Sequence, residues 1–214
     1  MYKYIILDFG GVIVTPTTGY WDITPKFLEL IDIDLLDKNL LKEKIKKYSY
    51  IKSEKIISLE EEYDMFNRFY TNVLSDFNIS KDVINDIAYD RVYGFDKYKL
   101  YDNVVDELNK LKEKYKLILL SDNWPSVIEY MREYKIYDYF DKVYISSIYG
   151  VEKKDRVFFD YMINDYDIKE GDALFIDDNE NNLEIASEKG LDVFLLDRSN
   201  NKTSKFKRIN DLYI

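Results

Sequence analysis

The stretch Tyr4-Ile5-Ile6-Leu7-Asp8-Phe9-Gly10-Gly11-Val12-Ile13-Val14 carries the strongest structural signal in the sequence. An apolar run too short for a helix ends in a carboxylate, and two glycines follow before apolar residues resume. This pattern indicates a buried strand that presents Asp8 at its carboxyl end, above a tight loop. Open parallel sheets carry their chemistry at that edge. An ordinary strand leading into a turn gives the same local pattern, so the later motifs must distinguish the two.

Bulk composition limits the chemistry to which Asp8 could contribute. The 214 residues are 46% hydrophobic and 34% charged, which is typical of a globular chain long enough to bury a core. Cysteine and histidine are both absent from the sequence. Their absence excludes disulfides, thiolate zinc sites, cysteine nucleophiles, Ser-His-Asp triads and imidazole acid–base catalysis. The groups that could still carry out catalysis are carboxylates, lysines, hydroxyls, backbone amides and a hard cation.

Charge and hydropathy narrow the choice of partners. The net charge of −10 argues against nucleic-acid binding, which needs concentrated Lys and Arg. The lysines of Lys42-Glu43-Lys44-Ile45-Lys46-Lys47 alternate with glutamate at helical spacing, which favours a solvated helix face over a phosphate-binding patch. No apolar run approaches membrane-spanning length, and no signal-peptide pattern is recognised. We therefore expect a cytoplasmic protein, monomer or homodimer, with no nucleic-acid or membrane partner.

The pattern of the chain changes after the first strand. Residues 15–19 are rich in turn formers, and residues 24–91 have only helical signals, with capping residues at helix starts and apolar residues three and four positions apart. Beyond residue 94, helical segments alternate with short apolar runs. The five expected strands are residues 3–8, 116–121, 142–146, 173–177 and 193–196.

This alternation predicts an α/β fold, a Rossmann-like parallel sheet with helices on both faces. The helical block is then a small all-helical cap, inserted after the first strand and above the carboxyl edge of the sheet. We expect an α/β core domain of residues 1–15 and 97–214, and a helical cap domain of residues 16–96.

Polar residues follow the expected strands. Asp8 ends the first strand, Ser121-Asp122-Asn123 the second and Asp177-Asp178-Asn179 the fourth, while Gly150-Val151-Glu152-Lys153-Lys154 follows the third. In a parallel sheet of adjacent strands these side chains converge on one crevice. Crowded carboxylates repel one another, and without histidine or cysteine the natural neutraliser is a cation such as Mg²⁺. With a lysine beside them, the residues themselves suggest a phosphate monoester as substrate.

These motifs, in this order, resemble those of the haloacid dehalogenase-like hydrolases over essentially the full length. The matching residues are Asp8-Phe9-Gly10-Gly11-Val12, then Ser121, then Lys153 after Gly150, then Asp177-Asp178 with Asn182. The forms Asp-Phe-Gly-Gly-Val and Phe-Ile-Asp-Asp-Asn-Glu-Asn-Asn are similar to the helical-cap branch that includes α-glucose-1-phosphatase.

The resemblance implies a role for each motif. Asp8 would attack phosphorus and form an aspartyl-phosphate, while Ser121 and Lys153 would bind the phosphoryl group. Mg²⁺ would be held by Asp8, the Gly10 carbonyl and Asp178, with Asp177 as a water-mediated ligand and Asn182 in support. Further candidates for substrate and phosphate binding are Gly11, Asp122, Asn123 and Lys154. For Asp122 and Asn182, helix capping is an equally good interpretation.

Gly10 departs from the common phosphatase pattern, which has there a second aspartate that protonates the leaving group. The related branch with glycine at this position still includes phosphatases, so the change concerns rate and leaving-group scope; general acid catalysis is typically worth about 10²–10⁴-fold. Asp22 or Tyr20, at the start of the cap, could supply the proton. The lack of this acid would slow the hydrolysis of a sugar 1-phosphate or an acyl phosphate least, because these have good leaving groups.

Two further departures lie close to the expected phosphate site. Lys154 stands where proline usually follows the lysine, so either Lys153 or Lys154 could point inward. Asp122 replaces the usual asparagine, and its charge would weaken anion binding unless it faces away.

Three hypotheses compete. The first is a Mg²⁺-dependent phosphatase of a small phosphorylated metabolite, with a sugar phosphate as the leading candidate. The second is a metal-independent 2-haloacid dehalogenase, against which the pair Asp177-Asp178 argues, because two acidic groups would repel a carboxylate substrate. The third is a catalytically weak family member that binds a ligand or a protein partner.

Overall fold

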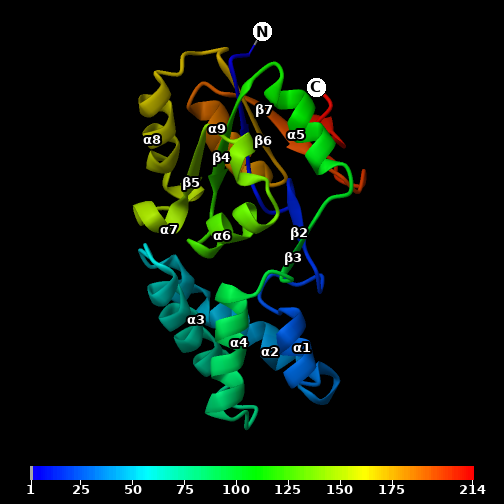
Figure 1. Ribbon diagram of the computed structural model, residues 1–214, viewed down its shortest axis with the longest axis vertical. Helices are drawn as coiled ribbons and strands as arrows, with labels where there is room; N and C mark the ends of the chain where they lie inside the picture. The colour runs from blue at the N-terminus through cyan, green and yellow to red at the C-terminus, as the bar shows by residue number, and fades with distance from the viewer. Residues whose placement is uncertain (1) are drawn as a thin grey trace.

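The computed structural model describes residues 2–214, and its largest unit is a six-stranded parallel sheet (Figure 1). The strands of this sheet are β1 (Tyr4–Leu7), β4 (Lys116–Ser121), β5 (Lys142–Ile145), β6 (Ala173–Asp177), β7 (Asp192–Leu196) and β8 (Lys207–Ile209). Their order is β5-β4-β1-β6-β7-β8, so β1 lies inside the sheet between β4 and β6. All neighbouring strands of this sheet run parallel, which confirms the Rossmann-like prediction.

Helices cover both faces of the sheet, as the sequence predicts. They are α5 (Val104–Lys112), α6 (Ser126–Glu133), α8 (Val157–Tyr166) and α9 (Glu180–Glu188). Ile5 and Leu7 of β1 belong to an apolar cluster with α5 and α6, whereas Ile6 belongs to a second cluster with α8 and α9. This division follows from the two-residue period of a strand, and it explains why the strand has no polar position.

A separate helical unit lies beyond the carboxyl edge of the sheet (Figure 1). Its helices are α1 (Pro25–Leu30), α2 (Lys38–Tyr48), α3 (Leu59–Val73) and α4 (Lys81–Tyr93). The side chains of Thr24, Ser58 and Ser80 accept hydrogen bonds from the backbone N–H three residues later, at 3.2, 3.2 and 3.3 Å, as N-caps do. The helices enclose an apolar cluster of their own. The predicted all-helical cap is therefore present, and residues 16–96 are the limits we propose for it.

Short elements complete the structure. They are α7 (Ser146–Tyr149) and the 3-10 turns η1 (Ile33–Leu35), η2 (Ser49–Ser53), η3 (Tyr137–Tyr139) and η4 (Lys153–Asp155). None of the helices in residues 2–214 combines the length and the apolar character that crossing a membrane requires.

Two predictions about local structure need correction. Residues 15–19 were expected to form a turn, but β2 (Val14–Pro16) pairs antiparallel with β3 (Tyr98–Leu100), and only residues 17–19 turn. This ribbon carries the chain from the core to the helices and back. The sixth strand of the sheet, β8, was not expected, because its Lys-Arg-Ile sequence has a single apolar residue.

Candidate active site

Asp8 directly follows β1, at the centre of the carboxyl edge of the sheet. Its backbone N–H donates to Ile176 O of β6 at 3.1 Å, and its side chain is buried. Gly11 then turns the chain with a φ of +75°, a conformation that side-chain-bearing residues rarely adopt. A Cβ atom at Gly11 would lie 2.5 Å from Asp178 Cγ, so any larger residue here would displace the Asp178 carboxylate.

Lys153 is the buried cation of the site. Its Nζ lies 2.9 Å from Asp8 Oδ1 and 2.7 Å from Asp177 Oδ2, and the residue is 1% exposed. Although burial alone would lower the pKa of Lys153, the carboxylates of Asp177 and Asp8 raise it above its usual range. Lys153 therefore carries a charge that is oriented by two acidic groups.

Lys154 does not join this group. Its ammonium pairs with Glu152 at 2.5 Å, and its side chain is 67% exposed. Successive residues of a 3-10 turn such as η4 point in different directions, so only one of the two lysines can face the site. The structure places Lys153 there, and the expectation that Lys154 binds phosphate finds no support in its position.

Three carboxylates form an acidic cluster. Asp8, Asp177 and Asp178 each offer an oxygen, and these atoms lie within 4.8 Å of one another. Burial raises the pKa of Asp178, and the neighbouring Asp177 raises it further. Burial also raises the pKa of Asp8, an effect that Lys153 opposes and Asp177 reinforces. Negative charge is concentrated here beyond what one lysine neutralises.

The cluster fits a hard cation such as Mg²⁺. Asp8 Oδ1 is buried and accepts no hydrogen bond within residues 2–214, although Lys153 Nζ lies 2.9 Å from it as an ion-pair partner. An acidic oxygen without a donor, beside a second carboxylate, suits an oxygen-preferring ion. Asp8 and Asp178 offer the side-chain oxygens for such an ion, and Gly10 also lines the cavity above them.

Asp177 has a different environment, because its oxygens are already occupied. Oδ2 accepts from Lys153 Nζ and from Asn182 Nδ2, the latter at 3.0 Å, and Oδ1 accepts from the Asn179 N–H at 2.8 Å. Asn182 does not cap α9, whose N-cap is Asn179. This geometry orients Lys153 and the acidic loop.

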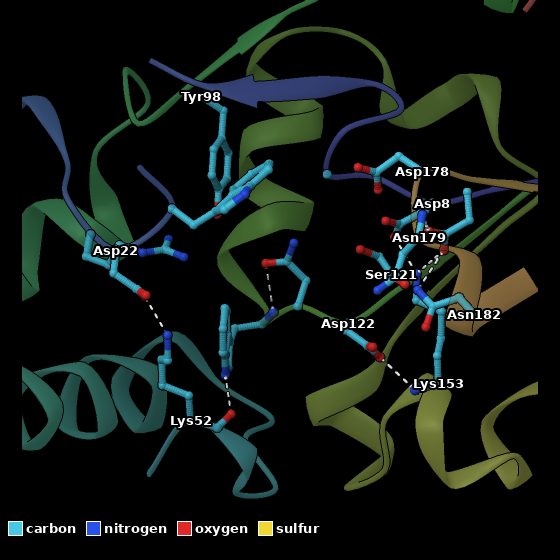
Figure 2. Close-up of a pocket in the computed structure, with 16 residues that line it drawn as sticks. Asp8, Asp22, Lys52, Tyr98, Ser121, Asp122, Lys153, Asp178, Asn179 and Asn182 are labelled. Atoms are coloured by element: carbon cyan, nitrogen blue, oxygen red, sulfur yellow. Dashed lines mark hydrogen bonds and ion pairs between the residues drawn. The ribbon is translucent and has the colours of Figure 1, made fainter. Parts of the chain in front are cut away.

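Ser121 and its neighbours line the next strand end (Figure 2). Ser121 ends β4 and is 1% exposed. Asp122 Oδ1 accepts the backbone N–H of Lys153 at 2.9 Å, so its carboxylate fixes the lysine loop while it lines the cavity. Burial raises the pKa of Asp122. The Asn123 N–H donates to Ser146 Oγ at 3.0 Å, and Asn123 Oδ1 accepts from the following N–H.

A cavity of about 300 Å³ connects this cluster to the helical unit. In Figure 2, Asp22, Lys52 and Tyr98 lie on one side of the cavity, and Asp8, Ser121, Lys153 and Asp178 lie on the other. Asp22 is a candidate proton donor by its place in the sequence, but its carboxylate pairs with Lys52 Nζ at 2.5 Å. Tyr20, the other candidate, is 58% exposed and does not line this cavity.

The indole ring of Trp21 lies over Gly10. A Cβ atom at Gly10 would lie 3.0 Å from the Trp21 ring, and the same ring packs against Tyr98 with centroids 5.8 Å apart. The indole therefore covers the position at which the side chain of a second acid would begin.

Besides Trp21, the cavity residues without a role assigned from the sequence include Lys52, Arg91, Tyr98 and Trp124. Arg91 had a detectable signal, because it continues the apolar stripe of Ile84, Ile87 and Ala88 on α4. A charged residue on the buried face of a helix indicates that its side chain has a specific role there. Lys52 lies in η2, where no periodicity marks it.

Comparisons with known proteins agree with this description. A family model described as haloacid dehalogenase-like hydrolase matches residues 2–190. D-ribitol-5-phosphate phosphatase from Bacteroides thetaiotaomicron is 34% identical over 97 residues, which are 42% of this chain and 47% of that protein. The match thus spans about half the length of this relative.

Solved structures with low sequence identity share the fold. L-2-haloacid dehalogenase from Xanthobacter autotrophicus with chloropropionic acid covalently bound has a TM-score of 0.70 at 13% identity, covering 99% of this chain and 96% of that one. A haloacid dehalogenase family enzyme from Bacteroides thetaiotaomicron, in complex with magnesium and inorganic phosphate, has a TM-score of 0.66 at 19% identity, covering 96% and 98%.

Proposed function

This chain belongs to the haloacid dehalogenase-like hydrolases, and we propose that it hydrolyses the phosphate ester of a small metabolite with Mg²⁺ bound at the acidic cluster. The observation that carries the proposal is the convergence of Asp8, Asp177 and Asp178 around the ammonium of Lys153. A phosphoryl group needs a nucleophile, a cation and hydrogen-bond donors in one place, and this edge of the sheet supplies them.

Hydrolysis takes two displacements at phosphorus. In the first, an Asp8 carboxylate oxygen bonds to phosphorus while the bond from phosphorus to the leaving oxygen breaks, and the departing alkoxide takes up a proton. In the second, water attacks the aspartyl-phosphate, giving inorganic phosphate and free Asp8. Lys153 holds the Asp8 carboxylate and stabilises charge on the phosphoryl oxygens, and Ser121 donates a hydrogen bond to one of them.

Mg²⁺ would be held by Asp8, Asp178 and the Gly10 carbonyl, and it would neutralise the phosphoryl group and the carboxylates around it. Asp177 and Asn182 contribute by orienting Lys153. Asp122 and Asn123 shape the phosphate end of the cavity, whereas Gly11, expected from the sequence to bind phosphate, does not line it.

Protonation of the leaving group does not come from the Asp8 loop. Gly10 has no side chain, and Trp21 covers the space above it. We therefore expect substrates whose leaving oxygen departs without a strong acid to react fastest, such as sugar 1-phosphates and acyl phosphates.

The relation to D-ribitol-5-phosphate phosphatase supports a phosphorylated sugar or sugar derivative as substrate. Dehalogenase chemistry is disfavoured by the acidic cluster, because Asp177 and Asp178 would repel a haloacid carboxylate in the absence of a cation. Likeness to a dehalogenase at 13% identity concerns the fold alone.

The test is hydrolysis of a panel of phosphorylated metabolites, with and without Mg²⁺, using Asp8→Asn as the blank. We expect Mg²⁺-dependent phosphate release that Asp8→Asn abolishes. Release that does not need the metal, or halide release from 2-haloacids, would contradict the proposal. No turnover above the blank would instead favour a binding protein with a degenerate active site.

A further inference from the structure

The cap end of the cavity contains a cation without an acidic partner. Three charged side chains line this end: Asp22, Lys52 and Arg91. Asp22 and Lys52 pair with each other at 2.5 Å, and Arg91 forms no ion pair with any described residue. Figure 2 shows Asp22, Lys52 and Tyr98 well separated from Asp8 and Lys153, so this end lies opposite the phosphate site.

Arg91 is buried among aromatic rings. The residue is 2% exposed, and its guanidinium carbon lies 4.5 Å from the ring centroid of Phe66 and 5.6 Å from those of Tyr98 and Trp124. Its Nε and Nη1 atoms are buried and make no hydrogen bond to any described residue. Cation–π contacts compensate only part of the desolvation of a guanidinium, which has five N–H donors to satisfy.

The buried carboxylate of Glu62 acts on Arg91 only through space, without an ion pair or a hydrogen bond between the two side chains. Its two oxygens accept from the N–H and the Oγ of Ser126, at 2.7 and 2.6 Å. No carboxylate lies within ion-pair distance of Arg91 in residues 2–214, whereas burial of an unpaired charge is costly. The guanidinium is therefore held ready for an anion from outside the chain.

The backbone around Arg91 is fixed to the core. Lys97 Nζ donates to Arg91 O at 2.8 Å, to Val92 O at 3.1 Å and to Ser126 Oγ at 3.1 Å. These bonds tie the end of α4 to the start of α6. Arg91 is thus preorganised relative to the sheet edge that carries Asp8.

We propose that Arg91 binds a carboxylate at the end of the substrate remote from the phosphate, so that among esters with the same leaving group the phosphorylated hydroxy acids are preferred. This inference rests on the proposed phosphatase function and deepens it. A carboxylate matches the planar donor fork of arginine and neutralises its charge, whereas a hydroxyl group can accept a bond but cannot neutralise the charge. The indole rings of Trp21 and Trp124 also line the cavity.

The test compares substrates that differ only at the remote end. Suitable pairs are 3-phosphoglycerate with glycerol 3-phosphate, and 4-phosphoerythronate with erythritol 4-phosphate. We expect kcat/KM to favour the acid of at least one pair by about 10- to 100-fold, the range of one charge-assisted contact, with most of the difference in KM.

Variants assign the preference to Arg91. We expect Arg91→Met to lose the preference and Arg91→Lys to retain part of it, because lysine keeps the charge but not the fork. The matched control is Arg68→Met, on α3, whose exposed side chain pairs with Glu54 and should leave the preference intact. Thermal denaturation of each variant checks that it is folded. The comparison of acid and alcohol with the wild-type enzyme does not depend on the folding of any variant.

The inference is overturned if the wild-type enzyme hydrolyses the alcohol and the acid of both pairs equally well, or if the preference survives Arg91→Met. Binding to Asp8→Asn, measured by calorimetry with 4-phosphoerythronate and erythritol 4-phosphate, separates this inference from the proposed function. If no substrate is turned over but the acid still binds more tightly in an Arg91-dependent way, the phosphatase proposal fails and the carboxylate site stands. Equal binding of the two compounds removes the carboxylate site.

Discussion

Gly11→Ala gives the sharpest test of how the site is assembled, because the chain offers a matched control. Gly11 and Gly19 both have positive φ, at +75° and +83°. A Cβ atom at Gly11 would meet Asp178, whereas one at Gly19 meets nothing within 4 Å. The two alanine variants therefore share the backbone cost and differ only in the effect on Asp178.

The shared cost is about 1 kcal/mol, because alanine resists the left-handed conformation while it also restricts the unfolded chain. For a chain of this size that lowers Tm by about 2–4 °C. The added cost at Gly11 follows from the contact: the new Cβ would be 2.5 Å from Asp178 Cγ, where ordinary contact begins at 3.4 Å, so the carboxyl carbon must retreat by about 0.9 Å. Mg²⁺ demands near-ideal octahedral geometry, and a misplacement of about 1 Å costs about 10²-fold in rate.

The assay is phosphate release as a function of Mg²⁺ concentration, with Tm measured in the same buffer. We expect Gly19→Ala to keep the wild-type Mg²⁺ half-saturation and to lose only stability. Gly11→Ala should lose similar stability and need about 10- to 100-fold more Mg²⁺. Equal Mg²⁺ half-saturation in the two alanine variants would refute the argument that Gly11 exists to make room for Asp178.

Three more predictions follow from single contacts. Lys153→Met should reduce phosphate release by at least about 10²-fold, whereas the exposed Lys154→Met should leave it near the wild-type rate; equal losses would show that the site uses both lysines. Ser126→Ala removes a 2.6 Å hydrogen bond to buried Glu62 and should cost about 1.5–3 kcal/mol in urea denaturation, and an unchanged midpoint would contradict this. Mg²⁺ at about 100 times its Kd should raise Tm by about 5 °C or more and chelation should reverse the rise, an effect that Asp178→Asn should lack.

The core of the fold was predictable because its central strands, β4 and β6, are almost entirely buried. The runs 116–121 and 173–177 were predicted with the bounds that the structure gives, since apolar residues fill both faces of these strands. The edge strand β8 could not be found in this way. It has three residues, two of them charged, and it is a strand only because β7 offers it a partner.

The phosphate end of the site was predictable for a related reason. Parallel strands bring their carboxyl ends to one edge, so Asp8, Ser121 and Asp177 had to lie close together once the sheet was inferred. Which residues line the cap end of the cavity depends instead on how the helical unit packs onto that edge of the sheet. Arg91 is far from Asp8 in sequence, and no local pattern reports that its helix face meets the cavity.

The glycine at position 10 and the tryptophan at position 21 are best understood as one arrangement. The indole approaches Gly10 closely enough that any side chain there would contact it, and Tyr98 supports the ring from behind. An acid at position 10 would be in tight contact with the indole at its present place, so the ring would have to shift by a few tenths of an ångström. The site therefore has an apolar wall where a proton donor would otherwise stand, which shifts the chemical demand to the substrate. A good leaving group would satisfy that demand at one end, and the proposed contact of a carboxylate with Arg91 would hold the substrate at the other. We therefore expect selectivity to come from binding and from leaving-group chemistry rather than from acid catalysis.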